Sequence, residues 1–268
     1  MNFLTKIEQK HLEYLAKLLK YGSSQLKMKS GDNLHFTHLQ SFLLFNQVAV
    51  HNYSEAICLL CKDARPHAAH VLLRSLFEAY TNAEYIKSKD SEKRLALFAR
   101  EGMIERNKIA NGFEQFIKKY PKKKNSLPVL EEKSIDKMKK FSEGHIKGIN
   151  NANKLNQKEV YPDIVSRSIK IDEEIPDSEE KGNSELYYHL VFRLLSPYAH
   201  LNAFGLEMFT EKGLDIIGQA KDVHHIILQT YLYYFSLLKN LFQHKILDGE
   251  MPDRYQKYFK ELKDTKIE

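Results

Sequence analysis

The sequence predicts an all-α fold, an irregular helical bundle of about seven helices with a lysine-rich helical insertion. Three observations predict it. The 268 residues include only 11 Gly and 7 Pro, too few for the frequent turns of a β-sandwich or barrel. Leu, Lys, Glu and Ala, which favour helix, dominate the long segments. In those segments apolar residues recur every three or four positions, the period of an amphipathic helix.

The first predicted helix is amphipathic, and a polar stretch over residues 22–34 separates it from the second. Residues 5–20 place leucines on one stripe, and this helix is expected to end at Gly22. Thr37 and Gln40 match a capping box, which predicts the start of a long central helix. We expect that helix to run to about Lys62.

The third predicted helix, 66–88, begins at Pro66, which suits a first helical turn, and is mostly apolar. Polar side chains nevertheless recur in it at steps of three and four, which places them on one stripe. Charges in an apolar helix need partners or a cleft. Arg74 and Glu78 therefore form either an i,i+4 pair beside a neighbour's polar groups or the floor of a polar pocket. The whole stripe consists of His67, His70, Arg74, Glu78, Asn82 and Tyr85.

The chain after the third predicted helix alternates charged and apolar segments. A charged helix capped by Ser91 is predicted to reach Lys119, and another covers roughly 130–156 as an antiparallel arm. We interpret 1–268 as a single helical domain, with residues 118–183 as an insertion or arm within it.

The next stretch, 157–183, is predicted as loop or a short helix. Ser184 opens a further helix, which Pro197 kinks or ends because proline removes a backbone hydrogen bond. A long apolar helix over about 220–247 and a short charged tail follow.

The excess positive charge is concentrated in one segment. Residues 118–147 hold ten lysines against four acidic residues, which equals the net charge of +6 of the whole chain. Such a segment suits contact with the phosphates of RNA, with Lys122, Lys123 and Lys124 as candidate contacts. A plain solvated surface is the alternative.

Several classes of protein are excluded by what the sequence lacks. Charged residues from Lys6 onward interrupt the N-terminal stretch, so no export signal is expected. Runs of about 18 apolar residues are absent, so no membrane span is expected and the predicted location is the cytoplasm.

The sequence also predicts no metal and no other cofactor. Cys58 and Cys61 form a lone CxxC in an apolar helix, which indicates buried thiols rather than a zinc site or redox pair. A di-iron site needs two Glu-xx-His pairs, and only Glu8-xx-His11 occurs, on a first helix that is expected to be exposed.

A second polar cluster follows Ser184. His189, Arg193, Ser196 and His200 recur at steps of four, three and four on one face of a mainly apolar helix. His200 either caps the helix end or, turned by the proline at 197, faces a groove.

The two clusters could form one pocket if their helices face each other. Arg74 and Arg193 would then make it cationic, His200 would lie beside Glu78 as a candidate general base, and Ser196 would supply a hydroxyl. We assign Arg193, His200, Arg74 and Glu78 as candidate catalytic residues, and Ser196, His70 and Asn82 as candidate substrate contacts.

The motifs LLRSLFEAYTNAEYI, SEKRLALFAREGMIERNKI and LYYHLVFRLLSPYAHLN resemble a bacterial helical domain-of-unknown-function family, number five-six-seven-seven. The resemblance covers about 60–110 and 185–202. It implies a helical fold and no established reaction. An Arg-xxx-Glu helix and a later Ser-xxx-His segment recur in that family, and here they fall on Arg74 with Glu78 and on Ser196 with His200.

The spacing from Arg193 to His200 is also similar to the Arg-x(4–6)-His motif of HEPN ribonucleases of toxin and phage-defence systems. This resemblance implies a homodimer in which Arg and His act on the 2′-hydroxyl and phosphate of RNA. Arg65 and His70 match the same motif, and Leu194 stands where a polar residue commonly follows the arginine.

Two functions of different classes therefore remain open. One is a metal-independent endoribonuclease of a defence or toxin system that acts through the Arg/His pocket. The other is a non-catalytic helical module that binds a protein partner or a small ligand through the same pocket.

Overall fold

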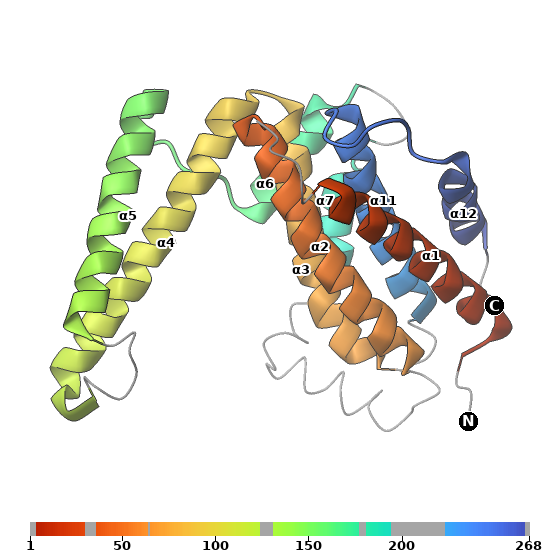
Figure 1. Ribbon diagram of the computed structural model, residues 1–268, viewed down its shortest axis with the longest axis horizontal. Coiled ribbons are helices and arrows are strands. Elements are labelled where there is room, and N and C mark those ends of the chain that lie inside the picture. The colour runs from red at the N-terminus through yellow and green to blue at the C-terminus, as the bar shows by residue number, and fades with distance from the viewer. Residues whose placement is uncertain are drawn as a thin grey trace. The chain divides into compact units, whose positions relative to one another are not determined.

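The computed structural model describes residues 4–29, 36–63, 65–123, 131–176, 181–193 and 223–265 (Figure 1). Within these ranges every regular element is helical, which confirms the all-α prediction. The chain divides into two compact units. We call Met1–Lys87 with Ile164–Glu268 the core unit, and Ser88–Asp163 the hairpin unit. The single-domain organisation with an insertion over 118–183 stays a prediction.

The core unit is built around one helix that is buried on almost its whole circumference. This helix, α11 (Val223–Gln243), contains three tyrosines with no exposed surface, Tyr231, Tyr233 and Tyr234. A helix that is apolar all round belongs in a core. The other elements of the unit are α1 (Lys6–Lys29), α2 (His38–Lys62), α3 (Pro66–Ser88), α6 (Ile164–Glu174), α7 (Asn183–Tyr187), the π-helical turn η3 (Tyr188–Arg193) and α12 (Asp253–Asp264).

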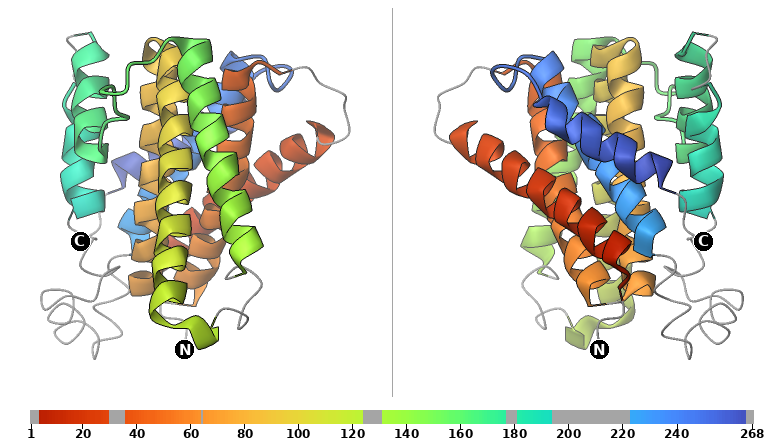
Figure 2. Two further views of the ribbon diagram at one scale, coloured as in Figure 1. Left: turned by 90° about the vertical axis from the view of Figure 1, so that its left-hand side faces the viewer. Right: turned by 90° about the vertical axis from the view of Figure 1, so that its right-hand side faces the viewer.

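The helices α1, α2 and α12 pack against α11 (Figure 2). The capping box predicted at the start of α2 is confirmed: the Thr37 side chain accepts from the Gln40 amide, and the Gln40 side chain accepts from the Thr37 amide. Both ends of α3 and both ends of α4 (Ser91–Lys119) also agree with the prediction. Strong local signals, a capping residue and a proline, therefore located the helix starts correctly.

The predicted end of the first helix at Gly22 is wrong, because α1 continues to Lys29. Gly22 lies where α1 passes over the ring of Tyr234 in α11, and a Cβ there would be 2.8 Å from the Tyr234 Cζ. The glycine therefore serves close helix packing rather than helix termination.

Three further expectations are corrected. The charged tail forms a helix, α12, which buries Tyr255 and Leu262 against the core. The last long helix ends at Gln243 rather than at about Leu247, and its predicted start at about residue 220 lies outside the described residues. Ser91 is not the cap of α4, because the N-cap position falls on Asp90.

The hairpin unit consists of α4, the short η1 (Pro121–Lys123) and α5 (Glu132–Asn153). α4 and α5 lie side by side and antiparallel (Figures 1 and 2). Arg100, only 4% exposed, donates from its guanidinium to the Asn150 Oδ1 at 2.9 Å and to the backbone carbonyls of Asn156 and Glu159. One buried cation thus holds the segment after α5 against α4.

Candidate functional site

The charged stripe of α3 meets the segment that carries the second predicted cluster. The Arg74 guanidinium carbon lies 4.1 Å from the centre of the Phe192 ring, and Phe77 contacts the same ring with centroids 6.4 Å apart. Phe192 is the penultimate residue of η3 and directly precedes Arg193. The first predicted cluster thus lies against the chain segment of the second.

Glu78, the other charge of this stripe, is directed to a third element. Its Oε1 lies 3.9 Å from an Nη of Arg167 on α6, whose side chain is 7% exposed against 48% for Glu78. Arg167 was not predicted as a site residue, because 157–183 was interpreted as loop or a short helix. The signal was present: Ile164–Glu174 is strongly amphipathic, and an arginine on its buried side requires an acidic partner.

α6 also fixes the start of α7. The carboxylate of the buried Asp172 accepts from the backbone N–H groups of Ser184 at 3.0 Å and Glu185 at 2.8 Å. This satisfies two amides that the first turn of a helix leaves without an internal partner. One short helix, α6, therefore positions both the Glu78 carboxylate and the α7–η3 segment.

η3 continues α7 as a π-helix over Tyr188–Arg193. Single π-helical turns within helices are frequent at functional sites, since they shift the side chains that follow out of register. The turn ends at Arg193, where the predicted Arg/His motif begins.

The remaining predicted residues on α3 are less accessible than Glu78. His67 and His70 are 8% and 5% exposed, Tyr85 is buried, and Asn82 is half-buried. A role of His70 or Asn82 in substrate contact stays a prediction.

Several predicted residues lie outside the described part of the chain. They are Ser196, His200 and Lys124, together with the side chains of Arg193 and Lys123. Lys122 is exposed in η1. The geometry around His200 is therefore a prediction, and the described residues establish only that its segment begins beside Arg74.

A family model matches residues 40–215. The chain belongs to DUF5677, a family of unknown function. The DUF5677 match includes both predicted clusters, the whole hairpin unit and helices α3, α6 and α7, so it extends well beyond the two segments on which the resemblance was based. Neither the curated proteins nor the solved structures include a match to the chain.

Outside the DUF5677 match, α1 and α11 bring two histidines together. The Nδ1 atoms of His11 and His224 are 3.0 Å apart, and both side chains are buried. His225, the next residue, is exposed. The expectation that Glu8 and His11 lie on an exposed helix is wrong: they are 4% and 1% exposed, because α12 and α11 cover this side of α1.

No cluster of three or more metal-binding side chains occurs among the described residues. Cys58 and Cys61 are free and buried, as predicted, and burial raises the pKa of both thiols. Over the same residues, no helix has the length and apolar character needed to cross a membrane.

The buried histidine pair predicts a stability that depends on pH. Burial, reinforced by His224, lowers the pKa of His11 from 6.5 to about 4, and burial also lowers the pKa of His224. Glu8, Lys10 and Glu261 are the charged groups that face the pair. Between about pH 6.5 and 4 the unfolded chain binds more protons than the folded chain, so the free energy of unfolding decreases as the pH falls through this range.

Urea unfolding at pH 7.5, 6 and 4.5 measures this effect. The variant His11→Asn is expected to lose stability less steeply than the wild type as the pH falls, because it lacks the buried imidazole. Equal pH dependences of the two proteins would contradict a buried neutral pair.

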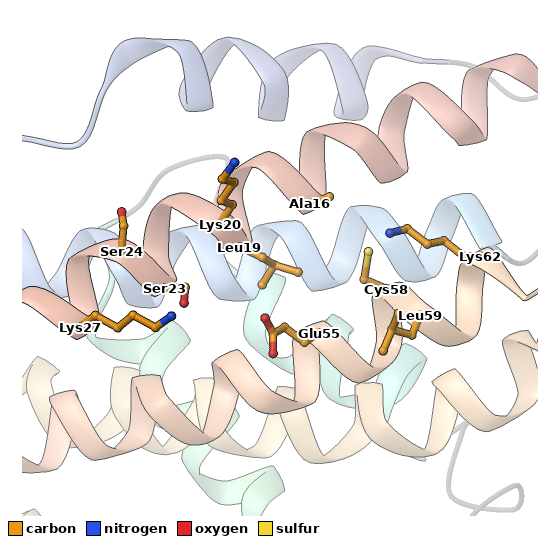
Figure 3. Close-up of a pocket in the computed structure, with 10 residues that line it drawn as sticks. All are labelled: Ala16, Leu19, Lys20, Ser23, Ser24, Lys27, Glu55, Cys58, Leu59 and Lys62. Carbon is orange, nitrogen blue, oxygen red and sulfur yellow. The ribbon is translucent and has the colours of Figure 1, made fainter.

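A separate hollow of about 590 Å³ lies between α1 and α2 (Figure 3). Its lining combines the apolar Ala16, Leu19 and Leu59 with Lys20 and Lys62. All of its lining residues come from these two helices, and α3 contributes none. The hollow and the Arg74 cluster are therefore different features of the core unit.

Proposed function

We propose that this protein is a metal-independent endoribonuclease whose reaction centre forms where α3 meets the segment 188–200. The supporting observation is the stack of the Arg74 guanidinium on Phe192 at 4.1 Å, which brings the charged stripe of α3 to the start of the Arg193/His200 motif. In this proposal Arg193 and His200 carry the reaction, and Arg74 and Glu78 support it.

The proposed reaction is an attack of the RNA 2′-hydroxyl on the adjacent phosphorus. The bond from phosphorus to the 5′-oxygen breaks, leaving a 2′,3′-cyclic phosphate and a 5′-hydroxyl. The His200 imidazole exchanges protons with these oxygens, because its ordinary pKa lies near neutrality. The guanidinium of Arg193 stabilises the added negative charge of the phosphorane by paired hydrogen bonds.

The described residues suit such a centre in two ways. Stacking on Phe192 fixes the plane of the Arg74 guanidinium while its charge is retained. The Glu78 side chain is 48% exposed, so water and substrate reach it even though Arg167 lies on its buried side. A fixed cation beside an accessible carboxylate is a suitable surrounding for phosphate chemistry.

The proposal is tested with two matched oligonucleotides in the presence of a chelator. One is a single-stranded RNA, and the other carries a single 2′-deoxynucleotide at the position where the first is cut. The purified protein is expected to cleave the first to a cyclic phosphate and to leave the second intact at that position. Cleavage of both strands there would contradict attack by the 2′-hydroxyl.

The alternative is a non-catalytic module that binds a protein partner or small ligand through the same pocket. Failure to cleave any RNA would favour it. The ribonuclease proposal further includes a cytoplasmic defence or toxin role and a homodimer, as the HEPN motif implies. Light scattering is expected to give twice the chain mass of 31.4 kDa.

A further inference from the structure

The hairpin unit holds more than the whole net charge of the protein. Ser88–Asp163 contains 18 Lys and Arg against 11 Asp and Glu, a net charge of +7, whereas the chain as a whole has +6. The rest of the chain is thus slightly negative. Any polyanion that binds this protein is attracted first to the hairpin unit.

Three of these cations, Lys133, Lys137 and Lys140, line one face of α5. Two shallow hollows, of about 560 and 630 Å³, follow each other along this helix and share Lys140 and Phe141. Lys133 and Lys137 line the first hollow with one acidic residue, Asp136. Gly144, His145, Gly148 and Asn153 belong to the second, which contains no acidic side chain.

The three lysines of this face are available for a ligand. Lys133, Lys137 and Lys140 are exposed and form no ion pair within the described part of the chain. Lys139, which points to the other side of α5, pairs instead with Glu114 at 2.7 Å. The free cations are spaced about 6 and 4.5 Å along the helix, in a row that an extended phosphate backbone can follow.

Planar side chains lie at the centre of the same face. The Phe141 ring is 42% exposed, the His145 ring stacks on it with centroids 3.9 Å apart, and the Arg106 guanidinium lies 4.5 Å from its centre. His145 is itself exposed. Such a group offers a stacking surface to an unpaired base.

Two glycines leave room beside the planar group. A Cβ at Gly144 or Gly148 would meet no atom within 4 Å, so a ligand can approach the helix backbone here. Gly144 and Gly148 lie one helical turn apart, and both line the second hollow of α5. Glycine in a helix interior lowers helix stability.

We propose that the α5 face, defined by Lys133, Lys137, Lys140, Phe141, Gly144, His145 and Gly148, binds single-stranded RNA. The phosphates lie along the lysines, and a base stacks on the Phe141/His145 group. An unpaired strand is favoured over a duplex because stacking needs unstacked bases. It is favoured over a lipid surface because Phe141 and the half-buried Ile149 are the large apolar side chains that line these hollows, which is too little apolar surface to insert. The inference rests on the proposed function only for the choice of RNA.

Binding is measured by fluorescence anisotropy with the full chain and a single-stranded 2′-fluoro oligouridine, which has no 2′-hydroxyl to attack. The triple variant Lys133→Gln, Lys137→Gln, Lys140→Gln is expected to bind at least tenfold more weakly. Its salt dependence, the slope of log K against log salt concentration, should decrease by about 2. The matched control replaces Lys257, Lys260 and Lys263 of α12 with Gln, three exposed lysines with nearly the same spacing, and should bind almost as the wild type.

A second pair of variants leaves the charge unchanged. Gly144→Leu places a bulky side chain on the α5 face and is expected to weaken binding several-fold. Gly112→Leu on α4, where a Cβ also meets nothing within 4 Å, should leave binding unchanged. Thermal unfolding verifies that both fold. Equal loss in the two lysine triples, unchanged binding by Gly144→Leu, or equal affinity for anionic lipid vesicles would overturn the proposal.

RNA cleavage and RNA binding test the two proposals independently. RNA cleavage that persists while binding is independent of the α5 face would overturn only the RNA face. Absence of cleavage with binding that depends on the α5 face would overturn only the ribonuclease.

Discussion

Replacement of His200 with alanine is expected to lower the rate of RNA cleavage by about 10²- to 10⁴-fold, the contribution typical of a general acid or base. RNA binding should change little, because the proposed binding face is on α5. Arg193→Ala should lower kcat by a similar factor, and Arg193→Lys should restore only part of it, since an ammonium cannot make the paired hydrogen bonds of a guanidinium.

His225→Ala is the matched control for His200, because it removes an exposed imidazole from the same half of the chain. Single-turnover cleavage with saturating protein separates the chemical step from binding. Cleavage by His200→Ala at the wild-type rate would eliminate the proposed mechanism, whatever the control shows.

The largest loss of stability is expected from Gly22→Ala. The new Cβ would clash with the hydroxyl oxygen of Tyr234 and lie 2.8 Å from its Cζ. Tyr234 has no exposed surface, and its hydroxyl is 2.9 Å from the His51 Nδ1, so the ring cannot retreat without disturbing α2. Overpacking of this kind costs about 1–3 kcal/mol or more.

Gly112→Ala provides the control, because its Cβ meets nothing within 4 Å. There the better helix propensity of alanine should stabilise the protein by about 0.5–1 kcal/mol. In the double variant Gly22→Ala, Tyr234→Phe, removal of the hydroxyl should recover part of the lost stability, which urea unfolding of the four proteins measures as a coupling energy. An unchanged stability of Gly22→Ala would show that α1 does not pass so close to α11.

Local signals in the sequence were sufficient for much of the fold. The capping box at Thr37 and the proline at 66 each locate a helix start, because both act on the backbone groups of the first turn. Gly22 could not be interpreted in this way. Its role depends on a tyrosine more than 200 residues away, and a helix-ending glycine looks the same in the sequence.

The candidate site was predictable only in part. The stripe from His67 to Tyr85 follows from helical periodicity, and three of its six residues, His67, His70 and Tyr85, are buried. The partners themselves did not follow, because Phe192 and Arg167 meet α3 through tertiary packing. Arg74 contacts Phe192 and Glu78 contacts Arg167. Both partners are far away in the sequence, and no spacing rule indicates them.

In the proposed ribonuclease, the stripe of α3 and His200 share one site. A paramagnetic label on Glu78→Cys tests it, since the exposed thiol reacts in preference to the buried Cys58 and Cys61. The imidazole resonances of His200, identified by their loss in His200→Ala, should broaden in the labelled protein, as should those of His189 in η3. Sharp His200 resonances beside broadened His189 resonances would place the imidazole away from α3 and contradict the account.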